Sequence, residues 1–282
     1  MKKALTLATA LVAVALSALL IAGCSNGASS SSSSSASSAA SEEGTTLIVG
    51  FDNSYPPYGF IGDDGEYTGL DLDLAQAVAD YYGWTVEFMP IDWDAKDALL
   101  DQGTVNCIWN GFTMEGREDS YNFSEPYMLN EQVIVVKADS GITSEADLAG
   151  KVAITQIDSA ALDVLEGDKK DLADTFQTLD TISDYNNAFM QLEAGTVDAV
   201  ACDLSIAAYQ MAANPGVYVQ LPEPLSSEHY AVGFAKTDDG KALAEKINEA
   251  LAALDADGTV KTICEKYADY GVSYDNWVLG KE

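Results

Sequence analysis

Two charged residues of the sequence are candidates for binding a ligand, and the first is an arginine. Arg117, in the segment "WNGFTMEGR", is the only arginine among 282 residues, and the other 13 basic residues are lysines. A guanidinium can bind a carboxylate through two parallel hydrogen bonds, which the ammonium group of lysine cannot do. We therefore expect Arg117 to bind a ligand carboxylate. The alternative is a weak surface ion pair with Glu115, Glu118 or Asp119.

The second residue is Asp203, which ends the apolar run "VDAVAC" and precedes a helical segment. Its carboxylate could bind an ammonium group, or it could cap the following helix. The segment "LEAGTVDAVACD" (192–203) repeats the pattern of "LDQGTVNCIWNG" (100–111). Ligands of open α/β sheets bind beyond the carboxyl ends of strands. The repeat therefore places two polar strand ends in two lobes, although any α/β repeat shares this pattern.

Three other segments could contribute to the same site. "GFDNSYPPYGF" (50–60) contains a rigid aromatic corner at Tyr55, because proline restricts its own φ and the residue before it. Trp93 lies where a predicted strand passes into a helix, and Ser159 lies at a predicted helix start, where free N–H groups can bind a carboxylate. The alternatives are a packed loop, a packed tryptophan and an ordinary helix cap.

Nothing in the sequence demands catalysis. His229 is the only histidine, it has no evident partner for a triad, and no glycine-rich phosphate loop is present. Cys107, Cys202 and Cys264 are odd in number and lack the spacing of metal ligands, so we expect no metal and no cofactor. The apolar run around Cys107 favours a buried free thiol, and a disulfide between Cys107 and Cys264 stays open.

Short apolar runs alternate with helical stretches along residues 45–282, as in "LIVGF", "LDLAQAVADYYG", "WTVEFM" and "DAKDALLDQG". This alternation predicts an α/β fold with largely parallel sheets. Asp71 is placed to cap the first helix and Gly83 to end it.

Two extended runs, "QVIVVKA" (132–138) and "HYAVGFAK" (229–236), are candidate crossovers between two lobes. We expect lobe 1 to comprise residues 45–136 and 231–282, with the C-terminal helices completing it, and lobe 2 to comprise residues 137–230.

The N-terminal segment is typical of a secreted lipoprotein. "MKK" and the apolar run after it predict a signal peptide, since the run is too short for a spanning helix. "LIAGC" resembles a bacterial lipobox, which predicts removal of residues 1–23 and lipidation of Cys24; the alternative is an ordinary cleaved signal. The serine-rich remainder of residues 24–44 predicts a flexible linker, whose root-mean-square end-to-end distance would be roughly 25 Å.

The chain is strongly acidic, with a formal charge of −31 that becomes −33 without Lys2 and Lys3. Such a chain repels nucleic acid and anionic lipid surfaces, so we expect no nucleic-acid partner. A lipid on Cys24, rather than charge, is expected to anchor the protein to the outside of the cell membrane.

Three segments resemble the family-3 solute-binding proteins, which serve ABC transporters for polar amino acids. They are "GFDNSYPPYGFIGDDGEYTGLDLDLAQAVA", "NGFTMEGREDSYNFSEPYM" and "LPEPLSSEHYAVGFAK", and the resemblance covers essentially residues 45–270. It implies a two-lobed periplasmic-binding-protein-like (type II) fold that closes on a free amino acid. Each lobe would be a mostly parallel sheet flanked by helices, and two hinge strands would join them.

The resemblance also implies which residues bind the ligand. Those of lobe 1 are Asp52, Tyr55, Trp93, Asn110, Gly111, Thr113 and Arg117, and those of lobe 2 are Ser159, Ala160 and Asp203. Two features depart from the family. "TMEGR" is one residue shorter between threonine and arginine than is usual, which changes the aim of Arg117. Ala160 replaces a second hydroxyl, so that only its backbone N–H can serve.

The function implied is a monomeric, lipid-anchored extracytoplasmic receptor that delivers an amino acid to a membrane permease. One alternative is a cyclohexadienyl (arogenate-type) dehydratase, which needs a positioned acid in the cleft. Another is the ligand-binding subunit of a sensor; since no spanning helix follows Glu282, sensing would need a separate membrane partner. Asp52 suggests a polar or cationic ligand side chain or only orders its loop, and Asn110 could bind an amide. Cystine, glutamine and basic amino acids therefore stay open.

Overall fold

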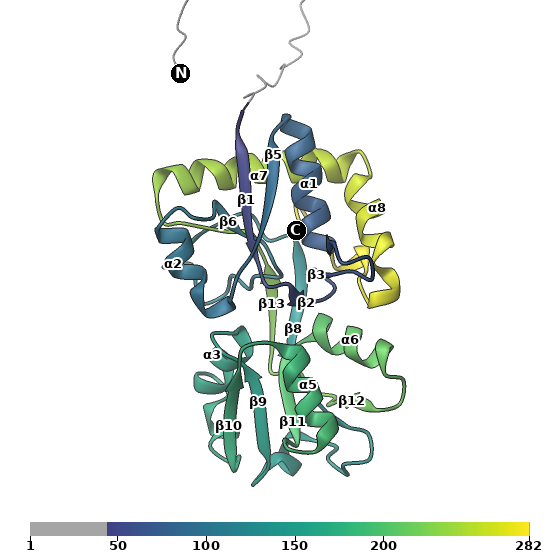
Figure 1. Cartoon of the computed structure of the whole chain (residues 1–282). Coiled ribbons are helices and arrows are strands. Elements are labelled where there is room, and N and C mark those ends of the chain that lie inside the picture. Colours follow the sequence, from purple (N-terminus) through teal and green to yellow (C-terminus); the bar gives the residue numbers. More distant parts are fainter. Residues whose placement is uncertain (1–43, 282) are drawn as a thin grey trace, which may run out of the picture. The chain divides into compact units, whose positions relative to one another are not determined.

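The computed structural model describes residues 44–281, so the predicted signal peptide, Cys24 and nearly all of the linker lie outside the described residues. The described residues form one five-stranded and one six-stranded sheet, each with helices against it, and a small three-stranded sheet (Figure 1). The predicted α/β fold is confirmed. Both large sheets are mixed. In each, three neighbouring strands pair in parallel, and the next strand in the order pairs with the third in the antiparallel sense.

The first sheet contains β1 (Thr46–Phe51), β5 (Thr85–Pro90), β6 (Cys107–Ile108), β7 (Asn122–Phe123) and β14 (Gly233–Phe234). Its order is β5-β1-β6-β14-β7, and β14 runs antiparallel to both of its neighbours. The small sheet, β2 (Ser54–Tyr55), β3 (Gly59–Ile61) and β4 (Tyr67–Thr68), follows β1 in the chain.

Four helices accompany the first sheet: α1 (Leu70–Tyr82), α2 (Lys96–Asp101), α7 (Asp238–Ala256) and α8 (Thr259–Lys266). The last two pack against α1, and α7 also contacts β7 and β14, so the C-terminal helices lie against the first sheet and its first helix.

The ends of α1 test two predictions. Gly83 ends the helix in a left-handed conformation (φ 71°), as predicted, because glycine adopts positive φ without strain. The predicted capping role of Asp71 is wrong. Gly69 takes the cap position, where a Cβ would lie 2.0 Å from the carbonyl oxygen of Tyr58. Asp71 instead lies buried in the first turn, with its carboxylate bonded to the backbone N–H of Gly111.

The second sheet contains β8 (Met128–Lys137), β9 (Val152–Gln156), β10 (Thr178–Ile182), β11 (Ala199–Asp203), β12 (Tyr218–Gln220) and β13 (Ser226–Tyr230). Its order is β10-β9-β11-β8-β12, and β13 pairs with the other end of β8. The accompanying helices are α3 (Ala160–Glu166), α4 (Lys170–Ala173), α5 (Tyr185–Ala194) and α6 (Leu204–Ala213).

Two strands join the sheets. β8 pairs with β13 over Met128–Gln132 and Ser226–Tyr230, while its second half pairs with β11 and β12. In Figure 1 these paired ends of β8 and β13 lie between the two large sheets. The chain therefore crosses twice through extended segments, at Met128–Gln132 and Ser226–Tyr230. The first crossing lies earlier than the predicted run 132–138, because Gln132–Lys137 already pair with β11 and β12 of the second sheet, so residues 132–136 do not belong to lobe 1.

The repeat found in the sequence has a structural counterpart. Residues 100–111 run from the end of α2 into β6, and residues 192–203 run from the end of α5 into β11. β6 pairs in parallel with β1, and β11 pairs in parallel with β9. The two copies therefore occupy corresponding positions in the two sheets.

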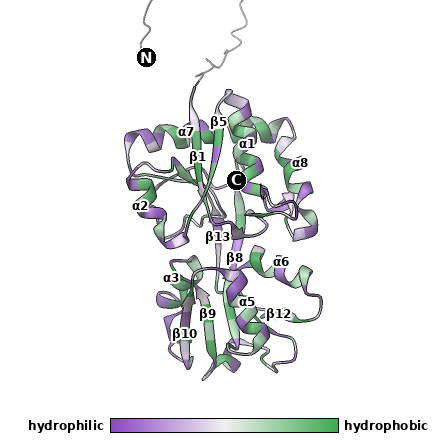
Figure 2. Cartoon of the chain, in the orientation of Figure 1, coloured by the Kyte–Doolittle hydropathy of each residue, from purple (hydrophilic) through white to green (hydrophobic). Residues whose placement is uncertain are grey.

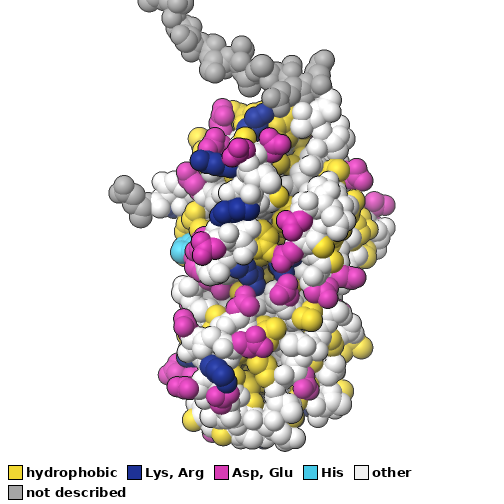
Figure 3. Space-filling view, turned by 90° about the vertical axis from the view of Figure 1, so that its left-hand side faces the viewer, with side chains coloured by type: hydrophobic (Ala, Val, Ile, Leu, Met, Phe, Trp, Pro, Cys, Tyr) yellow, Lys and Arg dark blue, Asp and Glu magenta, His cyan; other side chains and the backbone are white. Residues whose placement is uncertain are grey.

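Strands and helices both contribute buried hydrophobic residues to the core. Figure 2 shows the hydrophobic residues along β9, between β10 and β11 in the second sheet. Cys107, Cys202 and Cys264 are all buried free thiols, so the favoured interpretation of Cys107 is confirmed. Within residues 44–281, none of the helices is both long enough and apolar enough to cross a membrane. Acidic side chains are spread over the face drawn in Figure 3, among fewer basic ones.

Candidate functional site

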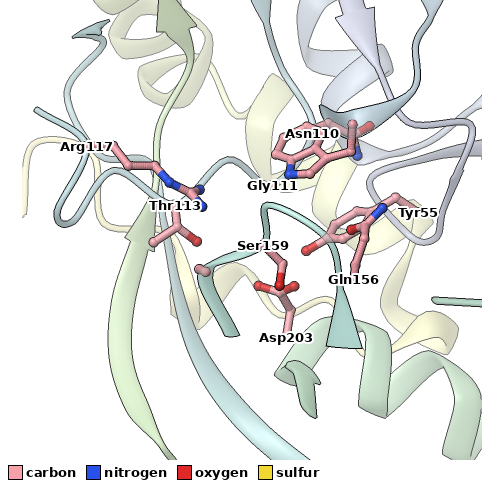
Figure 4. A pocket seen from close by; sticks show the side chains of 10 residues that line it. Tyr55, Asn110, Gly111, Thr113, Arg117, Gln156, Ser159 and Asp203 are labelled. Carbon is pink, nitrogen blue, oxygen red and sulfur yellow. The ribbon is translucent and has the colours of Figure 1, made fainter. Parts of the chain in front are cut away.

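A pocket lies where loops that follow strands of both large sheets meet (Figure 4). About 270 Å³ of space, part of it open to solvent, lies between its lining residues. Nine of the ten residues predicted from the sequence line it: Tyr55, Trp93, Asn110, Gly111, Thr113, Arg117, Ser159, Ala160 and Asp203. The remaining predicted residue, Asp52, does not line it, whereas Gln156, which the sequence analysis missed, does.

The strands explain why these residues meet. Trp93 follows β5 and Asn110 follows β6 in the first sheet, while Gln156 ends β9 and Asp203 ends β11 in the second. All four lie at carboxyl ends of parallel strands, where ligands of α/β sheets bind. Gly111 lets the backbone approach closely: its φ is 56°, and a Cβ there would lie 3.0 Å from the ring of Tyr55.

The guanidinium of Arg117 reaches across the pocket mouth. Its Nη2 donates to the carboxylate of Asp163 at 2.7 Å and to the carbonyl oxygen of Asp158 at 3.1 Å. Its Cζ lies 5.3 Å from the ring centre of Phe112, and the side chain is 12% exposed. The alternative of a surface pair with Glu115, Glu118 or Asp119 is wrong, because the ion-pair partner is Asp163 from α3.

The short segment before Arg117 forms a tight turn. The backbone N–H of Arg117 donates to the carbonyl oxygen of Met114 at 3.1 Å, and Gly116 has a positive φ of 79°. This i to i+3 bond and the glycine accommodate the missing residue of "TMEGR". The shorter turn still leaves Arg117 lining the pocket.

Asp203 stands at the start of α6, but its side chain makes no cap hydrogen bond. The helix-cap interpretation is therefore wrong for the carboxylate. Its Oδ1 accepts hydrogen bonds from Asn130 Nδ2 at 2.8 Å, Gln132 Nε2 at 2.6 Å and the hydroxyl of Tyr230 at 3.0 Å. Burial raises the pKa of Asp203, while the hydrogen bonds oppose that rise.

Asp52 lies behind the pocket wall. Its Oδ1 accepts the backbone N–H of Ser54 at 2.8 Å, and its Oδ2 accepts Nε2 of Gln156 at 2.7 Å. The first bond orders the loop, as one interpretation of the sequence expected. The second joins a loop of the first sheet to the end of β9 and fixes Gln156. Burial raises the pKa of Asp52.

Asn110 is the polar group of the pocket that lacks protein partners. The residue is 1% exposed, and among the described residues neither Oδ1 nor Nδ2 has a hydrogen-bond partner. Buried amides normally form hydrogen bonds, and an unpaired one costs about 1–3 kcal/mol. A ligand that offers a donor and an acceptor would satisfy it.

Asp158, between β9 and α3, contacts three side chains from the first sheet's side of the pocket. Its carbonyl oxygen accepts from Trp93 Nε1 and Arg117 Nη2, both at 3.1 Å, and its carboxylate pairs with the buried Lys96. It is the only non-glycine residue with positive φ (60°) in the part of the chain described. With this backbone conformation the carbonyl oxygen of Asp158 faces Trp93 and Arg117, which come from the first sheet's side of the pocket.

Ser159 is an ordinary helix cap as well as a pocket residue. Its Oγ accepts the backbone N–H of Leu162 at 3.1 Å, and Ala160, the first residue of α3, also lines the pocket.

The sequence analysis missed the residues that hold Asp203 in place. Asn130 and Gln132 alternate with other residues along β8 and lie buried on one face of it, as a strand period of two requires. Two amides at alternate positions of an apolar strand are a detectable signal of a buried polar network. Glu228 and Tyr230 alternate in the same way on β13.

The site therefore offers one guanidinium from the first sheet's side and one buried carboxylate from the second, with aromatic rings of Tyr55 and Trp93 beside them. Among residues 44–281, no group of three or more histidine, cysteine or acidic side chains is arranged to hold a metal ion. The arrangement suits recognition of a small zwitterion.

Residues 47–270 match the sequence model of the bacterial extracellular solute-binding proteins, family 3. The L-cystine-binding protein TcyJ of Escherichia coli (strain K12) is 29% identical over 227 residues, which are 79% of this chain and 82% of that protein. The ABC transporter arginine-binding protein 1 of the same strain is 29% identical over 223 residues, covering 77% and 88%.

Solved structures are similar over the same region. An ABC uptake transporter substrate-binding protein from Streptococcus pneumoniae, with histidine bound, has a TM-score of 0.77 and 35% identity, covering 81% of this chain and 94% of that one. An ancestral arginine-binding protein with glutamine bound has a TM-score of 0.71 and 36% identity, covering 79% and 97%.

Proposed function

Because this chain belongs to the bacterial extracellular solute-binding proteins of family 3, we propose that it binds a free amino acid between two closing lobes and delivers it to the permease of an ABC transporter. One lobe is the first sheet with α1, α2, α7 and α8, and the other is the second sheet with α3, α4, α5 and α6. The observation that carries the proposal is the placement of Arg117 and Asp203 on opposite sides of one pocket.

The two charges match the two ends of an amino acid. Arg117 binds the α-carboxylate, with Thr113 and the backbone N–H of Ala160 beside it, and Asp203 binds the α-ammonium group. Since these groups belong to different lobes, one ligand connects them only when the lobes are closed. The ligand then stabilises the closed state by its differential affinity for it.

The remaining pocket residues receive the ligand side chain. Tyr55 and Trp93 flank it with aromatic surface, and Asn110 and Gly111 line its end, while Asp52 acts through Gln156. The relatives named above bind cystine or arginine, and the related structures contain histidine or glutamine. These names support a polar or cationic amino acid, or cystine, as the class of ligand.

A thermal-shift screen of the common amino acids and L-cystine tests this proposal. A ligand at 100 times its dissociation constant adds about 2.7 kcal/mol to the free energy of unfolding, which gives a clear rise in melting temperature. No stabilisation by any of them would contradict the proposal. A binding role is also favoured over the dehydratase alternative by the relatives' names. Incubation with a cyclohexadienyl acid, monitored for an aromatic product, checks that choice.

We further propose that Cys24 carries a lipid that anchors the protein, as a monomer, outside the cell membrane. The support is the lipobox-like "LIAGC" before the serine-rich segment. Changing Cys24 to Ala should release the protein into the medium. Retention of that variant in the detergent-extracted membrane fraction would argue against the anchor.

A further inference from the structure

Two buried carboxylates share the same pair of amide donors beside the pocket. Nδ2 of Asn130 donates to Oδ1 of Asp203 and to Oε1 of Glu228, both at 2.8 Å. Nε2 of Gln132 donates to the same two oxygens, at 2.6 and 2.8 Å. Since each amide nitrogen carries two hydrogens, each amide can give one to either carboxylate. Asp203 and Glu228 are therefore bridged twice.

Hydroxyl groups also donate to both carboxylates. Thr113 Oγ1 donates to Glu228 Oε1 at 2.6 Å, and Tyr230 donates to Asp203 Oδ1 at 3.0 Å. All of these donors are neutral. In the described part of the chain, neither carboxylate forms an ion pair with a lysine or arginine. Asp203 is 5% exposed and Glu228 is 3% exposed. The two acids are therefore buried side by side and share only neutral donors.

Four other titratable side chains surround the pair on the pocket side. The titratable groups facing it are phenols and a thiol whose pKa values are raised well above their ordinary range, chiefly by burial: Tyr55, Tyr185, Tyr230 and Cys202. In the adjoining groove, which Thr113 and Glu228 also line, the other charged groups are Glu115, Asp163 and Asp168. Glu115 bonds to His229, and Asp163 to Arg117.

Two like charges this close in a low-dielectric site disfavour double ionisation. Burial is the main cause, and the charge of Asp203 the second, that raises the pKa of Glu228 to about 7. Burial also raises the pKa of Asp203. The two titrate as a unit.

We propose that Asp203 and Glu228 hold one proton between them in the empty pocket and give it up to the solvent when the ammonium group of the ligand binds. The proposal rests on the amino-acid-binding function above. The O–H bond of the carboxyl breaks, the proton goes to the buffer, and the ligand ammonium group keeps its three protons. Glu228 is thus a positioning residue that acts through Asp203 and through Thr113, which lines the pocket.

The sign of the pH dependence follows from linkage. The arriving positive charge favours the ionised pair, so the bound state holds fewer protons than the free state. Affinity therefore rises with pH below about 7, by at most about tenfold per pH unit, and levels off above it. At pH 6.5 binding should release about 0.5–0.8 proton.

Calorimetric titration in two buffers of different ionisation enthalpy counts the protons directly. The probe is the amino acid that gives the largest shift in the thermal screen. Glu228→Gln keeps the acceptor for Thr113 and the amides but cannot hold the proton, so its proton release should fall below about 0.1. If the probe is L-histidine, the variant also corrects for the probe's own imidazole.

Glu131→Gln is the matched control. Glu131 lies between Asn130 and Gln132 on β8, so its side chain points to the opposite face of the strand. The Glu131→Gln variant loses one carboxylate from the strand that pairs with β13, and it should release as many protons as the parent. Proton release near 0.5–0.8 in parent and control, and its loss in Glu228→Gln, is the expected result.

Two results would overturn the inference. Tight binding without proton release in the parent leaves the amino-acid-binding function intact but removes the shared proton. Equal release in the parent and in Glu228→Gln assigns the proton to another group. If Glu228→Gln does not fold, a pH-independent affinity of the parent between pH 5.5 and 8 decides against the proposal in the same way. Failure of every amino acid to bind is a different outcome, and it removes the function itself.

Discussion

Arg117 and Asp163 form an ion pair across the pocket mouth, with Nη2 2.7 Å from Oδ2. The only guanidinium of the chain therefore already has a carboxylate partner, which comes from α3 in the second lobe. Asp163 is 59% exposed, so water screens the pair and its contribution is only about 0–1 kcal/mol. A ligand carboxylate competes with Asp163 for one side of the guanidinium.

The first prediction concerns this competition. Changing Asp163 to Asn should leave ligand affinity unchanged or raise it by up to about fivefold, because Arg117 loses a competing anion. Calorimetric titration measures the effect, and Glu166→Gln, on the same helix, is the control for removing one negative charge. A loss of affinity greater than threefold would mean that Asp163 holds Arg117 in its binding orientation.

Trp93 supplies both a ring and a hydrogen bond. Its Nε1 donates to the carbonyl oxygen of Asp158 at 3.1 Å. Trp93→Phe keeps an aromatic ring but loses this contact between the two sides, so binding should weaken by about 0.5–1.5 kcal/mol. Trp93→Ala should weaken it further. The control is Trp84→Phe, whose indole N–H has no partner among the described residues. An unchanged dissociation constant for Trp93→Ala would assign the residue to packing alone.

Asp203 is predicted to bind the ligand ammonium group. Its change to Asn keeps an oxygen for the amides of β8 but removes the charge, so binding should weaken by roughly 2–5 kcal/mol. The free energy of unfolding, measured without ligand, should change much less, because the side chain caps no helix. The opposite pattern, lower stability with full affinity, would contradict this role.

Asp71 makes the stability depend on pH. It is fully buried, where it accepts the N–H of Gly111 and the hydroxyl of Tyr127, and burial raises its pKa to about 7. The folded state therefore binds a proton that the unfolded state, with a pKa near 3.8, has already lost. Between pH 4 and 7 this group makes the free energy of unfolding fall as pH rises, by at most about 1.4 kcal/mol per unit.

Urea unfolding at four pH values between 4.5 and 7.5 checks this prediction. Asp71→Asn, which cannot ionise, should show a shallower decline than the parent, although Asp52, Asp203 and Glu228 still contribute through their raised pKa values. Equal slopes for parent and variant would show that Asp71 does not titrate in this range.

Much of this architecture is predictable from local signals. The alternation of strands and helices gives the α/β fold, and the repeat that ends at Asn110 and Asp203 identifies the two strand ends that meet at the pocket. These features depend on short-range patterns of apolar residues and glycine, which a single sequence displays.

The errors come from contacts between distant segments. Asp71 looks like a helix cap, but Gly111, 40 residues away, binds its carboxylate. The partner of Arg117 lies 46 residues away in the other lobe, beyond the reach of any neighbouring acid in "EGRED". Gln156 lines the pocket with its amide held by Asp52, 104 residues earlier, and by the carbonyl oxygen of Ser183. In each case the partner of the side chain is brought near by the tertiary fold and cannot be found from neighbouring residues in the sequence.

The central claim is that Arg117 binds the α-carboxylate of a free amino acid, and calorimetric titration of its variants tests it most directly. Arg117→Lys keeps the charge but loses the paired donors, and Arg117→Ala leaves a desolvated carboxylate unpaired. The predicted loss for Arg117→Ala is about 2–5 kcal/mol, or about 30- to 5,000-fold in affinity, with Arg117→Lys between it and the parent. Affinity of Arg117→Ala within about threefold of the parent would contradict the account.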